Sequence, residues 1–139
     1  MKLGIIIYST DAEVVHNAFR LANFSLKLGD QVKVFLLASG VEYESLNSEK
    51  FNIIELAQKL LDEGGEILAC GTCLNLRKKD STELCPLSTI KDLYELVRDC
   101  DKTVTFGSLI SFLLLKSLIL SICLSIYSTA RLCSSIINL

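Results

Sequence analysis

Glu66-Ile-Leu-Ala-Cys70-Gly71-Thr72-Cys73 is the most informative stretch of this sequence, and it continues as Leu-Asn-Leu-Arg77. The apolar run before Cys70 predicts a buried strand, and Gly71 predicts a turn directly after it. Cys70 would then lie at the carboxyl end of a strand, where ligands and reacting groups collect in open α/β sheets. A helix beginning near Thr72 would direct its positive amino end at Cys70 and favour thiolate over thiol. The stretch therefore indicates an activated cysteine.

Strands and helices are expected to alternate on both sides of this stretch. Apolar and β-branched runs predict strands at residues 3–8, 31–38, 66–69 and 103–106. Apolar residues at helical spacing predict three longer helices, one from Thr10 to Gly29, one from Asn52 to Gly64, and one from Ser88 or Thr89 to Val97. The pattern predicts a long polar loop at residues 39–51 and a short helix with a loop at residues 71–87.

This alternation predicts an α/β fold with a small parallel sheet and helices on both faces, because strands joined through helices form right-handed βαβ units. A chain of 139 residues has room for one such domain. The last predicted strand ends at Phe106. We therefore expect one domain over residues 1–107, followed by a hydrophobic helical tail at residues 108–139.

The tail is rich in Leu, Ile and Ser, and its residues 109–127 are interrupted only by Lys116 and serines. That length is near the minimum for a membrane span, and Ser117, Ser121 and Ser125 form a small-residue stripe of the kind that packs helices in lipid. A lysine near the middle of a span is costly. Three alternatives stay open: membrane contact through residues 109–127, a helix that packs on the domain or on another subunit, and sequence that is not native.

Charge is concentrated in the predicted domain. All 16 acidic residues lie at or before Asp101, so residues 1–107 carry 12 basic and 16 acidic groups, a net charge of −4. This acidic balance argues against a nucleic-acid partner, which would require a basic surface. The sequence contains no GxGxxG, no P-loop and no pair of catalytic carboxylates, which excludes dinucleotide redox chemistry, phosphoryl transfer and glycoside hydrolysis. We expect no cofactor.

The apolar run at the amino terminus is too short, and is followed too soon by polar residues, to be a signal peptide. We therefore expect a cytoplasmic location. The six cysteines are then expected to be reduced, because the cytoplasm keeps thiols reduced. A Cys₄ zinc site could combine Cys70 and Cys73 with Cys85 and Cys100. Structural zinc sites usually have a second close pair of cysteines, which this sequence lacks. We therefore predict no metal site.

The order and spacing of several motifs resemble the DsrE/DsrF-like family of small sulfur-handling proteins over residues 2–106. The resemblance rests on the opening hydrophobic strand with its Ser-Thr-Asp helix start, on Ser39-Gly40-Val41-Glu42 after the second strand, on Ala69-Cys70-Gly71-Thr72-Cys73 with Arg77 downstream, and on the closing Thr103-Val104-Thr105-Phe106. Members typically end near that last phenylalanine, so the resemblance does not extend to the tail.

This resemblance implies a sulfur carrier or sulfurtransferase, because members that act in sulfur relay hold a persulfide on the cysteine that matches Cys70. Cys73 is an addition found in some branches only, and it is the second candidate catalytic residue. The motif residues Gly71, Thr72 and Arg77 are predicted to contact the substrate. The implied partners are sulfur-donor and sulfur-acceptor proteins, and the implied assembly is a homo-oligomer, commonly a trimer or hexamer.

Two other functions remain open from the residues alone. A dithiol redox protein would need both Cys70 and Cys73, whereas a persulfide carrier needs only Cys70. A non-catalytic binding module would need neither cysteine.

Overall fold

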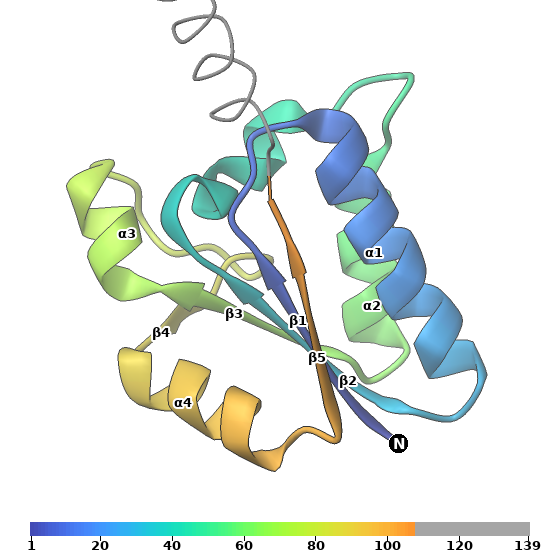
Figure 1. Cartoon of the computed structure of the whole chain (residues 1–139). Coiled ribbons are helices and arrows are strands. Elements are labelled where there is room, and N and C mark those ends of the chain that lie inside the picture. Colours follow the sequence, from blue (N-terminus) through green and yellow to red (C-terminus); the bar gives the residue numbers. More distant parts are fainter. Residues whose placement is uncertain (108–139) are drawn as a thin grey trace, which may run out of the picture. The chain divides into compact units, whose positions relative to one another are not determined.

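The computed structural model describes residues 1–107 as a five-stranded sheet in which every neighbouring pair of strands is parallel (Figure 1). The predicted tail at residues 108–139 lies outside the described residues. The strand order is β4-β3-β2-β1-β5. The strands are β1 (Lys2–Ile7), β2 (Gln31–Leu36), β3 (Glu66–Cys70), β4 (Leu87–Ser88) and β5 (Lys102–Phe106).

Helices connect the strands in chain order. They are α1 (Ala12–Lys27), the 3₁₀ helix η1 (Ala38–Leu46), α2 (Ile53–Asp62), α3 (Gly71–Leu76) and α4 (Ile90–Asp99). Asp11 caps α1 by accepting hydrogen bonds from the backbone N–H groups of Glu13 and Val14. Thr89 and Asp92 form a capping box at the start of α4. Within residues 1–107, no helix is long and apolar enough to cross a membrane.

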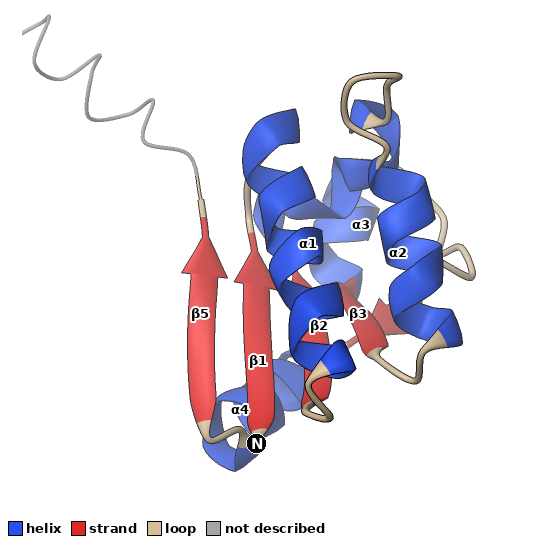
Figure 2. Ribbon diagram, turned by 90° about the vertical axis from the view of Figure 1, so that its right-hand side faces the viewer, coloured by secondary structure: helices blue, strands red, loops and turns tan. Residues whose placement is uncertain are grey.

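One face of the sheet is covered by α1 and α2, which lie side by side in front of the strands in Figure 2. Alternate residues of β1, β2 and β3 point into this layer, because successive side chains of a strand face opposite sides. The buried members include Ile5, Ile7, Val34 and Leu36 of the strands with Phe19 of α1. This layer is the main hydrophobic core.

The other face is covered by α4 (Figure 1) and holds a smaller apolar cluster of Ile6, Phe35, Cys70 and Leu96. The predicted α/β class, with a small parallel sheet and helices on both faces, is confirmed. The cluster under α4 joins β1, β2 and β3, whereas residues 102–105 of β5 are exposed.

The sequence pattern also missed two elements. The predicted polar loop at residues 39–51 begins as η1, whose Val41 and Tyr43 are buried although polar residues surround them. The predicted loop that ends at residue 87 contains the start of β4, which pairs with β3 at the edge of the sheet. Both elements are short and lack the periodicity from which longer helices and strands are recognised.

Candidate functional site

Cys70 is the last residue of β3, at the carboxyl end of a strand as the sequence predicted, and it is also the N-cap of α3. Its register partner is Ser88 of β4. The side chain belongs to the apolar layer under α4, and the residue is 8% exposed. Cys70 therefore lies at the carboxyl edge of the sheet with a small part of its surface open to solvent.

Gly71 allows the chain to turn from β3 into α3 against the neighbouring strand. A Cβ atom at this position would lie 3.1 Å from the carbonyl oxygen of Ser88 and 3.3 Å from the Leu87 side chain. The helix that follows has six residues, so the charge at its amino end is a minor influence on Cys70. Gly71 thus has a structural reason for being small, and its predicted substrate contact remains a prediction.

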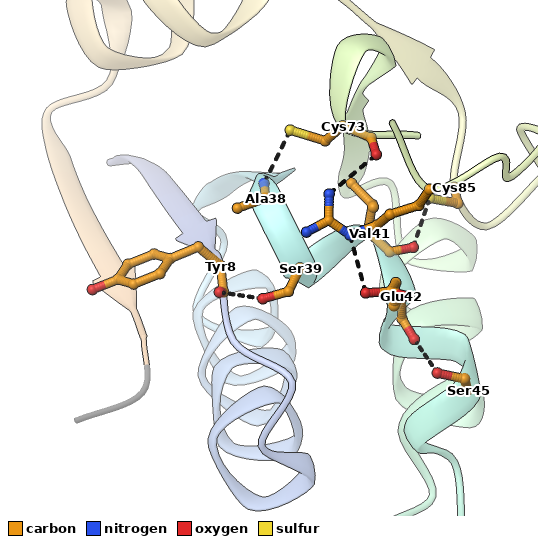
Figure 3. Close-up of polar contacts among 9 residues, drawn as sticks. Tyr8, Ala38, Ser39, Val41, Glu42, Ser45, Cys73 and Cys85 are labelled. Atoms are coloured by element: carbon orange, nitrogen blue, oxygen red, sulfur yellow. Dashed lines mark hydrogen bonds and ion pairs between the residues drawn. The ribbon is translucent and has the colours of Figure 1, made fainter. Parts of the chain in front are cut away.

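Cys73 lies in the first turn of α3, three residues after Cys70, and is half-buried. Its Sγ accepts a hydrogen bond from the backbone N–H of Ala38 at 3.2 Å (Figure 3). Burial raises the pKa of the Cys73 thiol, and the adjacent Cys70 sulfur raises this pKa further. The Ala38 N–H and the Arg77 charge act in the opposite direction. Cys73 is therefore a protonated thiol at neutral pH that packs against the same apolar cluster as Cys70 and accepts a hydrogen bond from a backbone donor.

Ala38 reaches Cys73 because the chain leaves β2 in a strained turn. Its φ is +50°, in the left-handed region that an alanine rarely adopts. The next residues connect η1 to the end of β1. The Ser39 hydroxyl donates a hydrogen bond to the Tyr8 carbonyl at 2.9 Å (Figure 3). Gly40 packs against the backbone of Ile7. These contacts of Ser39 and Gly40 hold the start of η1, and with it the Ala38 N–H, beside Cys73.

Arg77 is the C-cap of α3 and connects that helix to η1. Its Nε donates to Glu42 Oε2 at 3.0 Å, and a second guanidinium nitrogen donates to the Cys73 carbonyl at 3.2 Å. Both side chains of this ion pair are about one-third exposed. Arg77 therefore positions Cys73, whereas its predicted contact with substrate stays a prediction. Thr72 is exposed on the surface of α3.

Sequence reasoning missed two members of this site, Ala38 and Glu42. The Ala38 N–H is a backbone group in an unusual conformation, and no residue type signals it. Glu42 lies in the Ser39-Gly40-Val41-Glu42 motif, and its charge is opposite to that of Arg77. These opposite charges could have indicated an ion pair. The sequence alone, however, does not show that residues 42 and 77 are neighbours.

The other described cysteines are separate from this pair. Cys85 is 1% exposed and donates weakly to the Val41 carbonyl at 3.9 Å (Figure 3). Cys100 caps the end of α4, beside the start of β5, so it lies at the opposite end of the strands from Cys70. In the part of the chain that the structure describes, no cluster of three or more His, Cys, Asp or Glu residues could hold a metal ion.

Cys85 is expected to resist alkylation in the folded protein. Burial raises the pKa of its thiol to about 11, and two pKa units above an ordinary thiol correspond to about 100-fold less thiolate at neutral pH. Brief iodoacetamide treatment followed by peptide mapping should therefore label Cys70 well before Cys85. Equal labelling of the two in the native protein, with the expected equal labelling in denaturant as the control, would contradict this difference.

The sequence is similar to two uncharacterized proteins. The uncharacterized protein MJ0989 of Methanocaldococcus jannaschii is 34% identical over 116 aligned residues, which cover 76% of this chain and 100% of that protein. The uncharacterized protein MK0008 of Methanopyrus kandleri is 32% identical over 100 residues, which cover 68% of this chain and 83% of that protein. Both relatives are uncharacterized, so neither indicates an activity for this chain.

The chain is also similar to a solved structure and to a known protein family. The conserved protein of unknown function BT1422 from Bacteroides thetaiotaomicron superposes with a TM-score of 0.64 at 20% identity, over 76% of this chain and 94% of that one. That likeness supports the fold alone. Residues 1–106 match the DsrE/DsrF-like family. Because this match covers most of the chain, the protein belongs to the DsrE/DsrF-like family.

Proposed function

We propose that this protein is a sulfur carrier that holds a persulfide on Cys70 and passes the outer sulfur to a thiol of a partner protein. The observation that carries the proposal is the position of Cys70, which ends β3 at the carboxyl edge of the sheet beside a second thiol. Family membership suggests sulfur relay in general. The narrower role rests on this site.

The chemistry requires two displacements at sulfur. In loading, the Cys70 thiolate attacks the outer sulfur of a donor persulfide, a new S–S bond forms, and the donor leaves as a thiolate. In transfer, an acceptor thiolate attacks the outer sulfur of the Cys70 persulfide, and Cys70 leaves as a thiolate. Neither step changes the number of sulfane sulfur atoms, so no cofactor is required.

The small exposure of Cys70 is compatible with this role. Loading adds an S–S bond of about 2 Å, so the reactive outer sulfur extends beyond the atom that lies in the apolar layer. The inner sulfur stays among Ile6, Phe35 and Leu96. A persulfide held in this way presents its transferable atom to a docked partner and shields the other from water.

The predicted homo-oligomer also belongs to this proposal. The outer side of α4 exposes Ile90, Tyr94 and Val97, and the neighbouring strand β5 has exposed side chains along residues 102–105. A second copy of the chain that covered these apolar residues would remove them from water. Sulfur-donor and sulfur-acceptor proteins would then dock at the free carboxyl edge near Cys70.

The direct test is the intact mass of the reduced protein after incubation with inorganic polysulfide. We expect additions of about 32 Da, one for each sulfur atom bound, and peptide mapping should place the first on Cys70. A protein that gains no sulfur, or gains it equally at every cysteine, would contradict a dedicated carrier site.

A dithiol redox protein is the second candidate, and the placement of Cys70 and Cys73 at the start of α3, against one apolar cluster, favours it. Residues at the N-cap and three positions later lie on one side of a helix, within the range that a disulfide requires. This function predicts a loss of about 2 Da on oxidation and equal dependence on both cysteines. The Cys73→Ser variant therefore distinguishes the two candidates, because a carrier should still gain sulfur on Cys70 without Cys73.

A further inference from the structure

We propose that Cys73 is a resolving thiol that releases the sulfur held on Cys70 as hydrogen sulfide. The protein would then reduce sulfane sulfur to sulfide when no acceptor protein arrives. This activity rests on the proposed loading of Cys70, and it gives Cys73 a role that a simple carrier does not need.

The fold places Cys70 and Cys73 at the same end of α3. Cys70 is the N-cap of α3 and Cys73 stands in the first turn, so both side chains lie on the same side of the helix start. Each cysteine also contributes to the apolar cluster under α4. The inner sulfur of a Cys70 persulfide would occupy the position of the present thiol, next to Cys73.

Two groups beside Cys73 would stabilise the thiolate that forms during attack, although burial and Cys70 keep the resting thiol protonated. The Cys73 Sγ accepts a hydrogen bond from the Ala38 N–H at 3.2 Å. Ala38 has a strained left-handed backbone conformation. Arg77 adds positive charge on the same helix and is held in place by Glu42. A cysteine that served only for packing would need neither group, whereas a developing thiolate is stabilised by both.

The reaction balances without an external oxidant. The Cys73 thiolate attacks the inner sulfur of the Cys70 persulfide, a Cys70–Cys73 disulfide forms, and hydrosulfide leaves with the electron pair of the broken S–S bond. The outer sulfur is thereby reduced while the two cysteines are oxidised. Hydrosulfide is a weaker base than an alkyl thiolate, which favours this bond cleavage over transfer of the outer sulfur to Cys73. Two thiols of a small-molecule or protein reductant then restore the dithiol.

Release should accelerate as the pH rises. The groups that face the Cys73 sulfur are the Cys70 thiol from β3, the Ala38 N–H from η1, and Arg77 with its partner Glu42. Burial and Cys70 raise the pKa of Cys73 and outweigh the other groups. The thiolate is then the minor form at neutral pH, so the rate should rise with pH while the outer sulfur of the persulfide stays protonated, the form from which hydrosulfide can leave.

The experiment is a single turnover on the full chain. Reduced protein is loaded with inorganic polysulfide, separated from the excess, and followed by sulfide assay and by intact mass. We expect the persulfide to disappear as about one sulfide per loaded chain is released, with a disulfide that peptide mapping places between Cys70 and Cys73. Cys73→Ser should load equally and lose its sulfur at least about tenfold more slowly.

Cys100→Ser is the matched control, because Cys100 is half-buried at the opposite end of the strands and should release sulfide as the unaltered protein does. A persulfide that persists equally in the unaltered protein and in Cys73→Ser would overturn this inference and leave the carrier function standing. A disulfide between Cys70 and a cysteine other than Cys73 would also overturn it. So would transfer of the outer sulfur from Cys70 to Cys73 with no release of sulfide. Failure of both proteins to load would instead refute the carrier function.

Discussion

A Cys70→Ser variant is expected to lose persulfide loading completely, whereas Cys73→Ser should load to the level of the unaltered protein. A hydroxyl cannot form the S–S bond on which loading depends, so the loss should exceed about 100-fold. Intact mass after treatment with inorganic polysulfide measures both variants in one experiment. If Cys73→Ser abolishes loading as fully as Cys70→Ser, the dithiol mechanism replaces the carrier.

This comparison needs a check on folding, because Cys70 is buried in the apolar layer under α4. Placing a hydroxyl there is expected to cost about 1–3 kcal/mol of unfolding free energy. Cys70→Ala avoids the buried polar group and should also fail to load. Thermal denaturation of each variant then separates loss of chemistry from loss of fold. If Cys70→Ala folds and still gains sulfur at the same rate, the site lies elsewhere.

The sequence predicted the fold well where long, regular patterns were present. The four predicted strands at residues 3–8, 31–38, 66–69 and 103–106 all exist, with end points that differ by at most two residues from those of β1, β2, β3 and β5. The apolar character of β1, β2 and β3 reflects burial on two faces, which a parallel sheet imposes on its central strands. Cys70 could be placed at a strand end for the same reason.

The surroundings of the cysteine pair could not be predicted in this way. Ala38 and Glu42 belong to η1, a 3₁₀ helix whose short turns carry no long periodicity. Their importance comes from tertiary contacts with α3, which lies more than 30 residues further along the chain. A sequence shows which residues are reactive more readily than it shows which backbone groups surround them.

Gly40→Ala is expected to destabilise the protein and to disturb Cys73 at the same time. A Cβ atom at Gly40 would lie 2.2 Å from the carbonyl oxygen of Ile7 and 2.8 Å from its carbonyl carbon. Backbone atoms cannot rotate away as a flexible side chain can, so η1 must move from the end of β1. We expect a loss of about 2–3 kcal/mol of unfolding free energy, measured by urea denaturation.

The shift should reach the site because Ala38 stands two residues before Gly40, and its N–H donates to the Cys73 sulfur. Release of sulfide from the loaded protein should therefore slow in Gly40→Ala, while loading of Cys70 continues. Ser39→Ala is the milder comparison: it removes one hydrogen bond to the Tyr8 carbonyl, adds no atom, and should cost about 1 kcal/mol and slow release less than Gly40→Ala does. If Gly40→Ala is no more destabilising than Ser39→Ala, the close packing of η1 against β1 contributes little to stability. In that case η1 would not hold Ala38 in a fixed position, and the hydrogen bond from Ala38 would not explain the reactivity of Cys73.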